Sequence, residues 1–178
     1  MRTGKQIEDD IWRMLGDSVL GLSLSGGVYK EGMRPRDSKL EDAVVIFSAG
    51  LPEEVQTGVV TINIYVPDRD FYGNGQLLED LKRTTAIEER AKNWVEGLTC
   101  DMSNYKFNLR QTITTDYEPK IHQHFVVVVL GYSYYAGGDD ELPLLETEEG
   151  DVLDVIPMQL KTPQSHVVEI QPKQSINI

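Results

Sequence analysis

Three places in this chain of 178 residues hold side chains or turns that could do chemistry. The first is the pair His122 and His124, which are two residues apart in an apolar stretch that predicts a strand, so both imidazoles should project from one face. Two imidazoles at this spacing can bind a metal ion, but metal sites in proteins use three or four ligands, and the sequence indicates no third. We interpret the pair as polar residues near the start of a strand and predict no bound metal.

The second place is the turn Gly73-Asn74-Gly75, which precedes a predicted helix as phosphate-binding loops do. It lacks both the third glycine and the Lys-Ser/Thr pair of a P-loop, so we interpret it as a helix-capping turn. The third is Cys100, the only cysteine, for which no activating base is evident and no internal disulfide is possible. No Ser/His/Asp pattern or Cys/His cluster accompanies these residues, and we therefore predict no catalytic residue, no cofactor and no enzyme.

A basic loop is the most distinctive feature of the chain. Arg34 and Arg36 flank Pro35, which fixes its own φ and lacks an N–H, so neither arginine should lie inside a helix. Glu41 and Asp42 follow closely, and the resulting polarised surface suits docking to another protein. We predict an interface that includes Arg34, Arg36, Glu41 and Asp42. The alternative is that the arginines pair with these carboxylates within one subunit.

Two tyrosines near the end of the last predicted strand, Tyr132 and Tyr134, are further candidates. Aromatic rings in such places can stack on nucleic-acid bases, but no basic residues are interleaved with them. We predict that they lie at the edge of the core or in a subunit interface.

The net charge of −12 is unevenly placed. Nine acids and two bases lie from residue 137 onward, against twenty acids and fifteen bases before it. An acidic protein repels the phosphate backbone, so specific DNA binding is not expected, although DNA could slide through an acidic channel. No apolar run is long enough to cross a membrane, and Met1–Gln6 leads into acidic residues, so we expect a cytoplasmic product without a membrane partner.

The pattern of apolar residues predicts an α+β fold with the order α-β-β-β-α-β-β, a mainly antiparallel sheet and helices packed on one side. Thr3 and Gln6 form a potential capping box for the first helix. Residues 121–135 are apolar on both faces, which predicts a strand inside the sheet. The expected helices span residues 4–16 and 76–96, and the expected strands 28–29, 43–48, 59–66, 105–113 and 121–135. We expect one domain over residues 1–136 and an extended, acidic, proline-containing arm over 137–178.

The segment Tyr29…Arg34-Pro35…Ser38…Glu41-Asp42-Ala43-Val44-Val45, followed by residues 58–67, is similar to uncharacterised phage and prophage proteins of Bacteroides-type hosts. Together with the order of elements, it resembles the tail terminator and tail-completion (neck) proteins of tailed phages. The resemblance covers about residues 1–136 and includes no catalytic residue.

This resemblance implies a structural virion assembly subunit. Such subunits form a ring, most often a hexamer, at the head–tail junction; the ring terminates the tail tube, docks to the head connector, and lets DNA pass without binding it. The protein would lie in the host cytoplasm during assembly and in the virion afterwards. The first alternative is another neck or adaptor protein of the same virion. The less favoured alternative is a small metal-dependent hydrolase or nuclease that acts through His122 and His124.

Overall fold

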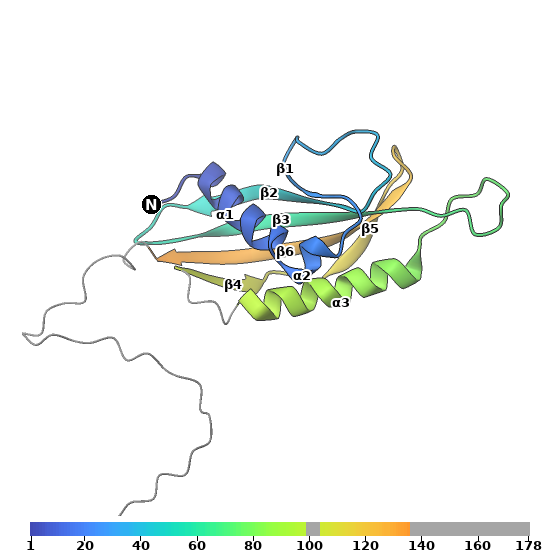
Figure 1. The fold of residues 1–178 in the computed structure, drawn as a ribbon. Helices are drawn as coiled ribbons and strands as arrows, with labels where there is room; N and C mark the ends of the chain where they lie inside the picture. Colours follow the sequence, from blue (N-terminus) through green and yellow to red (C-terminus); the bar gives the residue numbers. More distant parts are fainter. Residues whose placement is uncertain (99–103, 136–178) are drawn as a thin grey trace, which may run out of the picture. The chain divides into compact units, whose positions relative to one another are not determined.

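The fold was analysed in a computed structural model, which describes residues 1–98 and 104–135 (Figure 1). Three helices and six strands follow one another in this described part of the chain. They are α1 (Gly4–Gly16), α2 (Val19–Leu22), β1 (Val28–Lys30), β2 (Asp42–Leu51), β3 (Val55–Pro67), α3 (Leu81–Leu98), β4 (Tyr105–Leu109), β5 (Thr114–Glu118) and β6 (Gln123–Tyr135). Cys100 and residues 137–178, including the predicted arm, lie outside the described residues. No helix in the described part is long and apolar enough to cross a membrane.

The strands form one open sheet in the order β1-β2-β3-β6-β4, and β5 pairs with β6 beside β4. Only β1 and β2 are parallel; every other pairing is antiparallel. The predictions of an α+β fold and a mainly antiparallel sheet are therefore confirmed, and β6 lies inside the sheet as expected.

The predicted order of elements was wrong in two details. A short helix, α2, follows α1, and its first turn is capped by the hydroxyl of Ser18, which accepts the N–H of Gly21. The predicted single strand over residues 105–113 ends at Leu109, and a further strand, β5, lies between the two strands that were predicted over residues 105–113 and 121–135. Both short strands pair with β6, which is 13 residues long and therefore offers room for β4 and β5 in succession.

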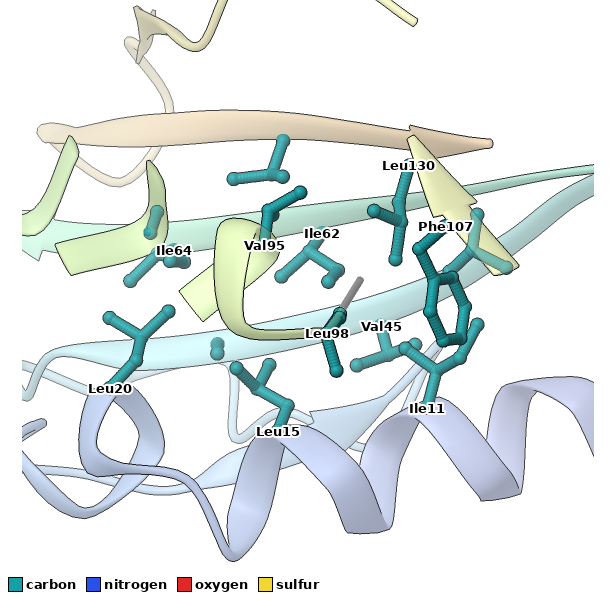
Figure 2. Close-up of a cluster of buried hydrophobic side chains, with 14 of the residues drawn as sticks. Ile11, Leu15, Leu20, Val45, Ile62, Ile64, Val95, Leu98, Phe107 and Leu130 are labelled. Carbon is teal, nitrogen blue, oxygen red and sulfur yellow. The ribbon is translucent and has the colours of Figure 1, made fainter. Parts of the chain in front are cut away.

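The helices cover one face of the sheet, as predicted, and the core lies between them (Figure 2). α1 begins with the expected capping box of Thr3 and Gln6. Its apolar stripe of Ile7, Ile11 and Leu15 is fully buried, because residues three or four apart share one side of a helix. They share one core with Val95 and Leu98 of α3 and with strand residues that include Val45, Ile62, Ile64, Phe107 and Leu130.

α3 begins at Leu81 and not at residue 76, which corrects the prediction. The side chain of Asp80 caps the helix by accepting the N–H of Arg83 at 3.1 Å. The residues before it belong to a loop, where Leu78 and Arg69 exchange two backbone hydrogen bonds of 2.8 and 3.0 Å. The N–H and C=O groups of Leu78 are therefore bound to Arg69, and α3 does not extend back to this residue.

Candidate assembly surfaces

The basic loop lies against the face of the sheet that the helices leave open, and Arg34 is bound within the chain. Its Nε donates to Asp42 Oδ2 at 3.0 Å, and its Nη2 donates to Gln123 Oε1 at 2.6 Å. The guanidinium also lies 4.1 Å from the centroid of the Tyr65 ring. The Arg34 side chain is 11% exposed and that of Asp42 is 0% exposed, so this ion pair is internal.

The other two charged residues of the predicted interface differ in their surroundings. Glu41 accepts both Nε and Nη2 of Arg83, at 2.5 and 2.7 Å, and thereby joins the loop to α3. This hydrogen-bonded pair raises the pKa of Arg83 above its ordinary value. Arg36 is exposed. The prediction of an intermolecular contact through this loop therefore now depends on Arg36.

Tyr132 lies in the core and not on the surface. Its side chain is 1% exposed, and its ring crosses two glycines that face each other on β2 and β3, Gly50 and Gly58. The hydroxyl is buried without a hydrogen-bond partner among the described residues, and burial raises its pKa. Tyr134 is half-buried, with its ring 5.6 Å from the guanidinium of Arg2.

The hydroxyl of the neighbouring Tyr105, unlike that of Tyr132, has a hydrogen-bond acceptor among the described residues. Its hydroxyl donates to Asp10 Oδ2 at 2.6 Å. Burial first, and then this hydrogen bond, raise the pKa of Tyr105 far above its ordinary value. The hydroxyl therefore stays protonated and serves as a donor that fastens β4 to α1.

The two histidines do not project from one face, because only His124 belongs to a strand. His122 lies in the turn between β5 and β6, with a positive φ of 52°. His124 contacts Asp68 through Nδ1 at 2.6 Å and approaches Glu79 through Nε2 at 3.9 Å. These carboxylates lie on opposite ring nitrogens and cannot share one ion with the imidazole. No group of three His, Cys, Asp or Glu side chains suited to a metal occurs among the residues that the structure describes.

The turn Gly73-Asn74-Gly75 does not cap α3, since it lies within the loop that connects β3 to that helix. Asp70 at the start of the loop accepts the N–H groups of Tyr72, Asn74 and Gly75 at 3.2, 3.2 and 2.8 Å. These backbone hydrogen bonds, with Gly75 the strongest, lower the pKa of Asp70. The chain's own carboxylate thus occupies the donors that a phosphate would need.

Among the described residues, two stretches at the edges of the sheet pair with no further strand, which the sequence did not reveal. β1 pairs with β2 only over Ala43–Val45, so the outer side of β2 from Ile46 to Leu51 meets no strand in the described part of the chain. The outer side of β4 from Lys106 to Leu109 likewise pairs with no other described strand. Figure 1 shows β2 and β4 on the two sides of the sheet, with β3 and β6 between them.

Both edges are open at the same end of the sheet. Four consecutive rows of paired residues cross from one edge to the other: Phe47-Val60-Leu130-Leu109, Ala49-Val59-Gly131-Asn108, Gly50-Gly58-Tyr132-Phe107 and Leu51-Thr57-Ser133-Lys106. The charges beside the two edges are complementary. Exposed Glu53 and Glu54 follow β2, whereas exposed Lys106 and Arg110 lie on and after β4.

No protein-family model matches the chain, and no curated protein matches it.

Proposed function

We propose that this chain is a non-enzymatic structural subunit of a tailed-phage virion, which joins copies of itself side by side into a ring at the head–tail junction. In this role the ring ends the tail tube and docks to the head connector. The resemblance of residues 29–67 to phage proteins supports the virion assignment. The single observation that supports self-assembly is the pair of free edges in the same four rows of the sheet.

The direction of the strands makes the two edges suitable partners. Three successive antiparallel pairings separate β2 from β4, so these strands run in opposite directions. A second copy that continues the sheet therefore places its β4 antiparallel to β2 of the first copy, which is the more stable kind of pairing. An exposed strand edge is a template for such pairing. With the rows continued in register, Leu51 lies beside Lys106 of the neighbour, so Glu53 and Glu54, just beyond Leu51, would approach that lysine.

This contact uses two different surfaces of each subunit. Repeated contacts of that kind close into a ring when the rotation per copy divides a full turn, and otherwise give an open filament. The twist of a sheet supplies a rotation at every step. The resemblance described above implies six copies in the closed ring.

Substitution of one edge residue tests the proposal. The N–H of Arg110 donates inward to Val129 O at 2.9 Å, so by alternation the N–H of Leu109 points away from β6. Leu109→Pro removes that outward donor without removing a bond of the ladder. We expect light scattering to give a ring for the wild-type chain and for Leu109→Ala, and a folded monomer for Leu109→Pro.

Two other outcomes would favour the alternatives. A wild-type chain that stays monomeric, both alone and with the tail-tube protein, would indicate an adaptor and not a ring former. Stoichiometric zinc or manganese in the purified chain, with a nuclease activity that His122→Ala abolishes, would indicate an enzyme.

A further inference from the structure

The loop over residues 68–80, which connects β3 to α3, projects past the end of β3 and away from the sheet (Figure 1). The reciprocal backbone hydrogen bonds between Arg69 and Leu78 close its stem. An ion pair of 3.1 Å between Arg69 and Asp80 ties the stem to the start of α3. His124 contacts Asp68 on one side of the stem and approaches Glu79 on the other.

The tip of the loop is held in one conformation by its own residues. The three N–H groups that Asp70 accepts fix the turn, and Gly73 and Gly75 supply the positive φ values of 66° and 83° that it requires. A loop held in this way loses little conformational entropy when it docks.

This ordered loop exposes large apolar side chains. Phe71 is 53% exposed and Tyr72 is 72% exposed, while Leu81 at the start of α3 is 68% exposed. Aromatic anchors on a pre-organised element are typical of the few residues that supply most of the binding energy in protein interfaces. The loop thus combines the anchors and the rigidity of a docking element.

The charges of the loop indicate what it would meet. Residues 68–80 contain four acids (Asp68, Asp70, Glu79 and Asp80) and one base (Arg69). No Lys, Arg or His in the described ranges lies within ion-pair distance of Asp70. A partner with complementary charge would carry Lys or Arg around an apolar pocket.

Five hollows on the described part of this chain each have a single Lys or Arg in their lining, so none of them has a rim of several basic residues; these cations are Arg13, Arg90, Lys92, Lys82 and Lys30. A hollow of about 550 Å³ lies between α3 and the residues after β4, with Leu109 and Ile113 among its apolar lining residues. Its rim contains Glu88, Glu89 and Glu96, and only one cation, Lys92. Insertion of the negatively charged loop there would bring like charges together.

We propose that loop 68–80 docks a different protein, through insertion of Phe71 and Tyr72 into an apolar pocket rimmed by basic residues. The inference rests on the proposed function in one respect. When copies join side by side, the equivalent strands of all copies point in the same direction, so all the loops project from the same rim of the ring. The loops then face a component that stacks on the ring along its axis.

Photocrosslinking in cells that produce the full chain with the products of its neighbouring genes tests this inference. A photoreactive phenylalanine analogue at position 71 should crosslink to one protein other than this chain, identified by mass spectrometry. The same analogue at position 106, on the free edge of β4, should crosslink two copies of the chain. A self-crosslink at position 71, or none, overturns the docking role. Loss of the self-crosslink at position 106 alone overturns the ring and leaves the docking loop intact.

The charge of the loop gives a second test with the identified partner. Gln76 is exposed and uncharged, so Gln76→Lys and Gln76→Glu change only the local charge. We expect Gln76→Lys to weaken binding severalfold and Gln76→Glu to strengthen it; equal affinities, or the opposite order, contradict a basic rim. Phe71→Ala with Tyr72→Ala should weaken binding at least tenfold, whereas the control pair Val19→Ala with Leu22→Ala, whose side chains are even more exposed, should change it less than twofold. Equal losses for the two pairs overturn the proposal.

Discussion

Arg34 is held by three different interactions inside one subunit: an ion pair, a hydrogen bond to an amide and a contact with an aromatic face. Its partner Asp42 also accepts the N–H of Gly27 at 3.2 Å, so this one carboxylate joins the basic loop to the start of β1. This arrangement fixes the loop on the sheet, because the buried charged and polar groups form hydrogen bonds with one another in place of hydrogen bonds with water.

Arg34→Ala should therefore destabilise the fold. The change leaves the buried carboxylate of Asp42 without its cation, which typically costs about 3–5 kcal/mol. Arg36→Ala removes an exposed charge and should change the free energy of unfolding by less than about 0.5 kcal/mol. Urea denaturation measures both. An unchanged midpoint for Arg34→Ala, together with loss of self-association, would show that Arg34 acts between subunits.

The two core tyrosines should respond in opposite ways to loss of the hydroxyl. Tyr132→Phe removes a buried hydroxyl that has no partner among the described residues, so stability should stay the same or rise by up to about 1 kcal/mol. Tyr105→Phe removes a donor to Asp10 and should cost about 1.5–3 kcal/mol, as expected for a bond to a charged group. Thermal unfolding of the two variants distinguishes them; a larger loss for Tyr132→Phe would reveal a partner for its hydroxyl.

Among the elements, β2 and β3 depend on glycine at the point where the Tyr132 ring crosses them. A Cβ at Gly58 would lie 2.3 Å from the carbonyl oxygen of Ala49 and 2.5 Å from the Tyr132 hydroxyl oxygen. The close packing of the sheet at this crossing thus leaves no space for a methyl group.

Gly58→Ala should cost roughly 1–3 kcal/mol or more, because overpacking forces the backbone to move. Gly97→Ala is the matched control: nothing lies within 4 Å of its Cβ position on α3, and alanine is a better helix former by about 1 kcal/mol. Denaturant unfolding should show a loss for the first variant and a gain for the second. A gain for both would mean that β2 and β3 can separate without cost.

The loop of residues 68–80 should lose its order in acid. The pKa of Asp70 is lower in the folded loop than in the unfolded chain, so its hydrogen bonds stabilise the loop above the unfolded pKa, and this contribution is lost as the pH falls through the folded pKa. We expect rapid amide exchange and shifted NMR resonances for Asn74 and Gly75 at low pH. In Asp70→Ala the same changes should appear at neutral pH; unchanged amides in that variant would mean that the glycines alone fix the turn.

Local signals predicted some elements well and others poorly. α1 could be predicted because its capping box and its stripe lie within a few residues of one another. The split between β4 and β5 could not, since alternation continues to Ile113 and the bend depends on pairing with β6. The pairing of Arg34 with Asp42 within one subunit was the alternative that the sequence offered. Its bond to Gln123 could not be predicted, because Gln123 lies 89 positions away. The candidate edges depend on which strands lack a neighbour, and that is a property of the whole sheet.

At the scale of the whole molecule, a contact between two different edges predicts how mixtures behave. Leu109→Pro blocks the β4 edge. Leu51→Lys places a cation in the same row as Lys106, so with rows continued in register it repels the neighbour and blocks the β2 edge. Each variant should be monomeric alone, and an equimolar mixture should give a heterodimer that grows no further. Analytical ultracentrifugation measures the size of the species in each sample. A homodimer of either variant would indicate that equivalent edges pair with each other.

The position of β6 between β3 and β4 also affects how the chain is made. The ribosome adds roughly 5–20 residues per second, so the β2–β3 hairpin is complete about 3–14 s before the end of β6 is synthesised. During that interval the edge of β3 that later pairs with β6 has no partner, and this strand carries the apolar residues Val60, Ile62 and Ile64. Slow translation or a truncated message should therefore yield aggregates instead of subunits, and the supply of soluble chain should depend on chaperones that shield this strand.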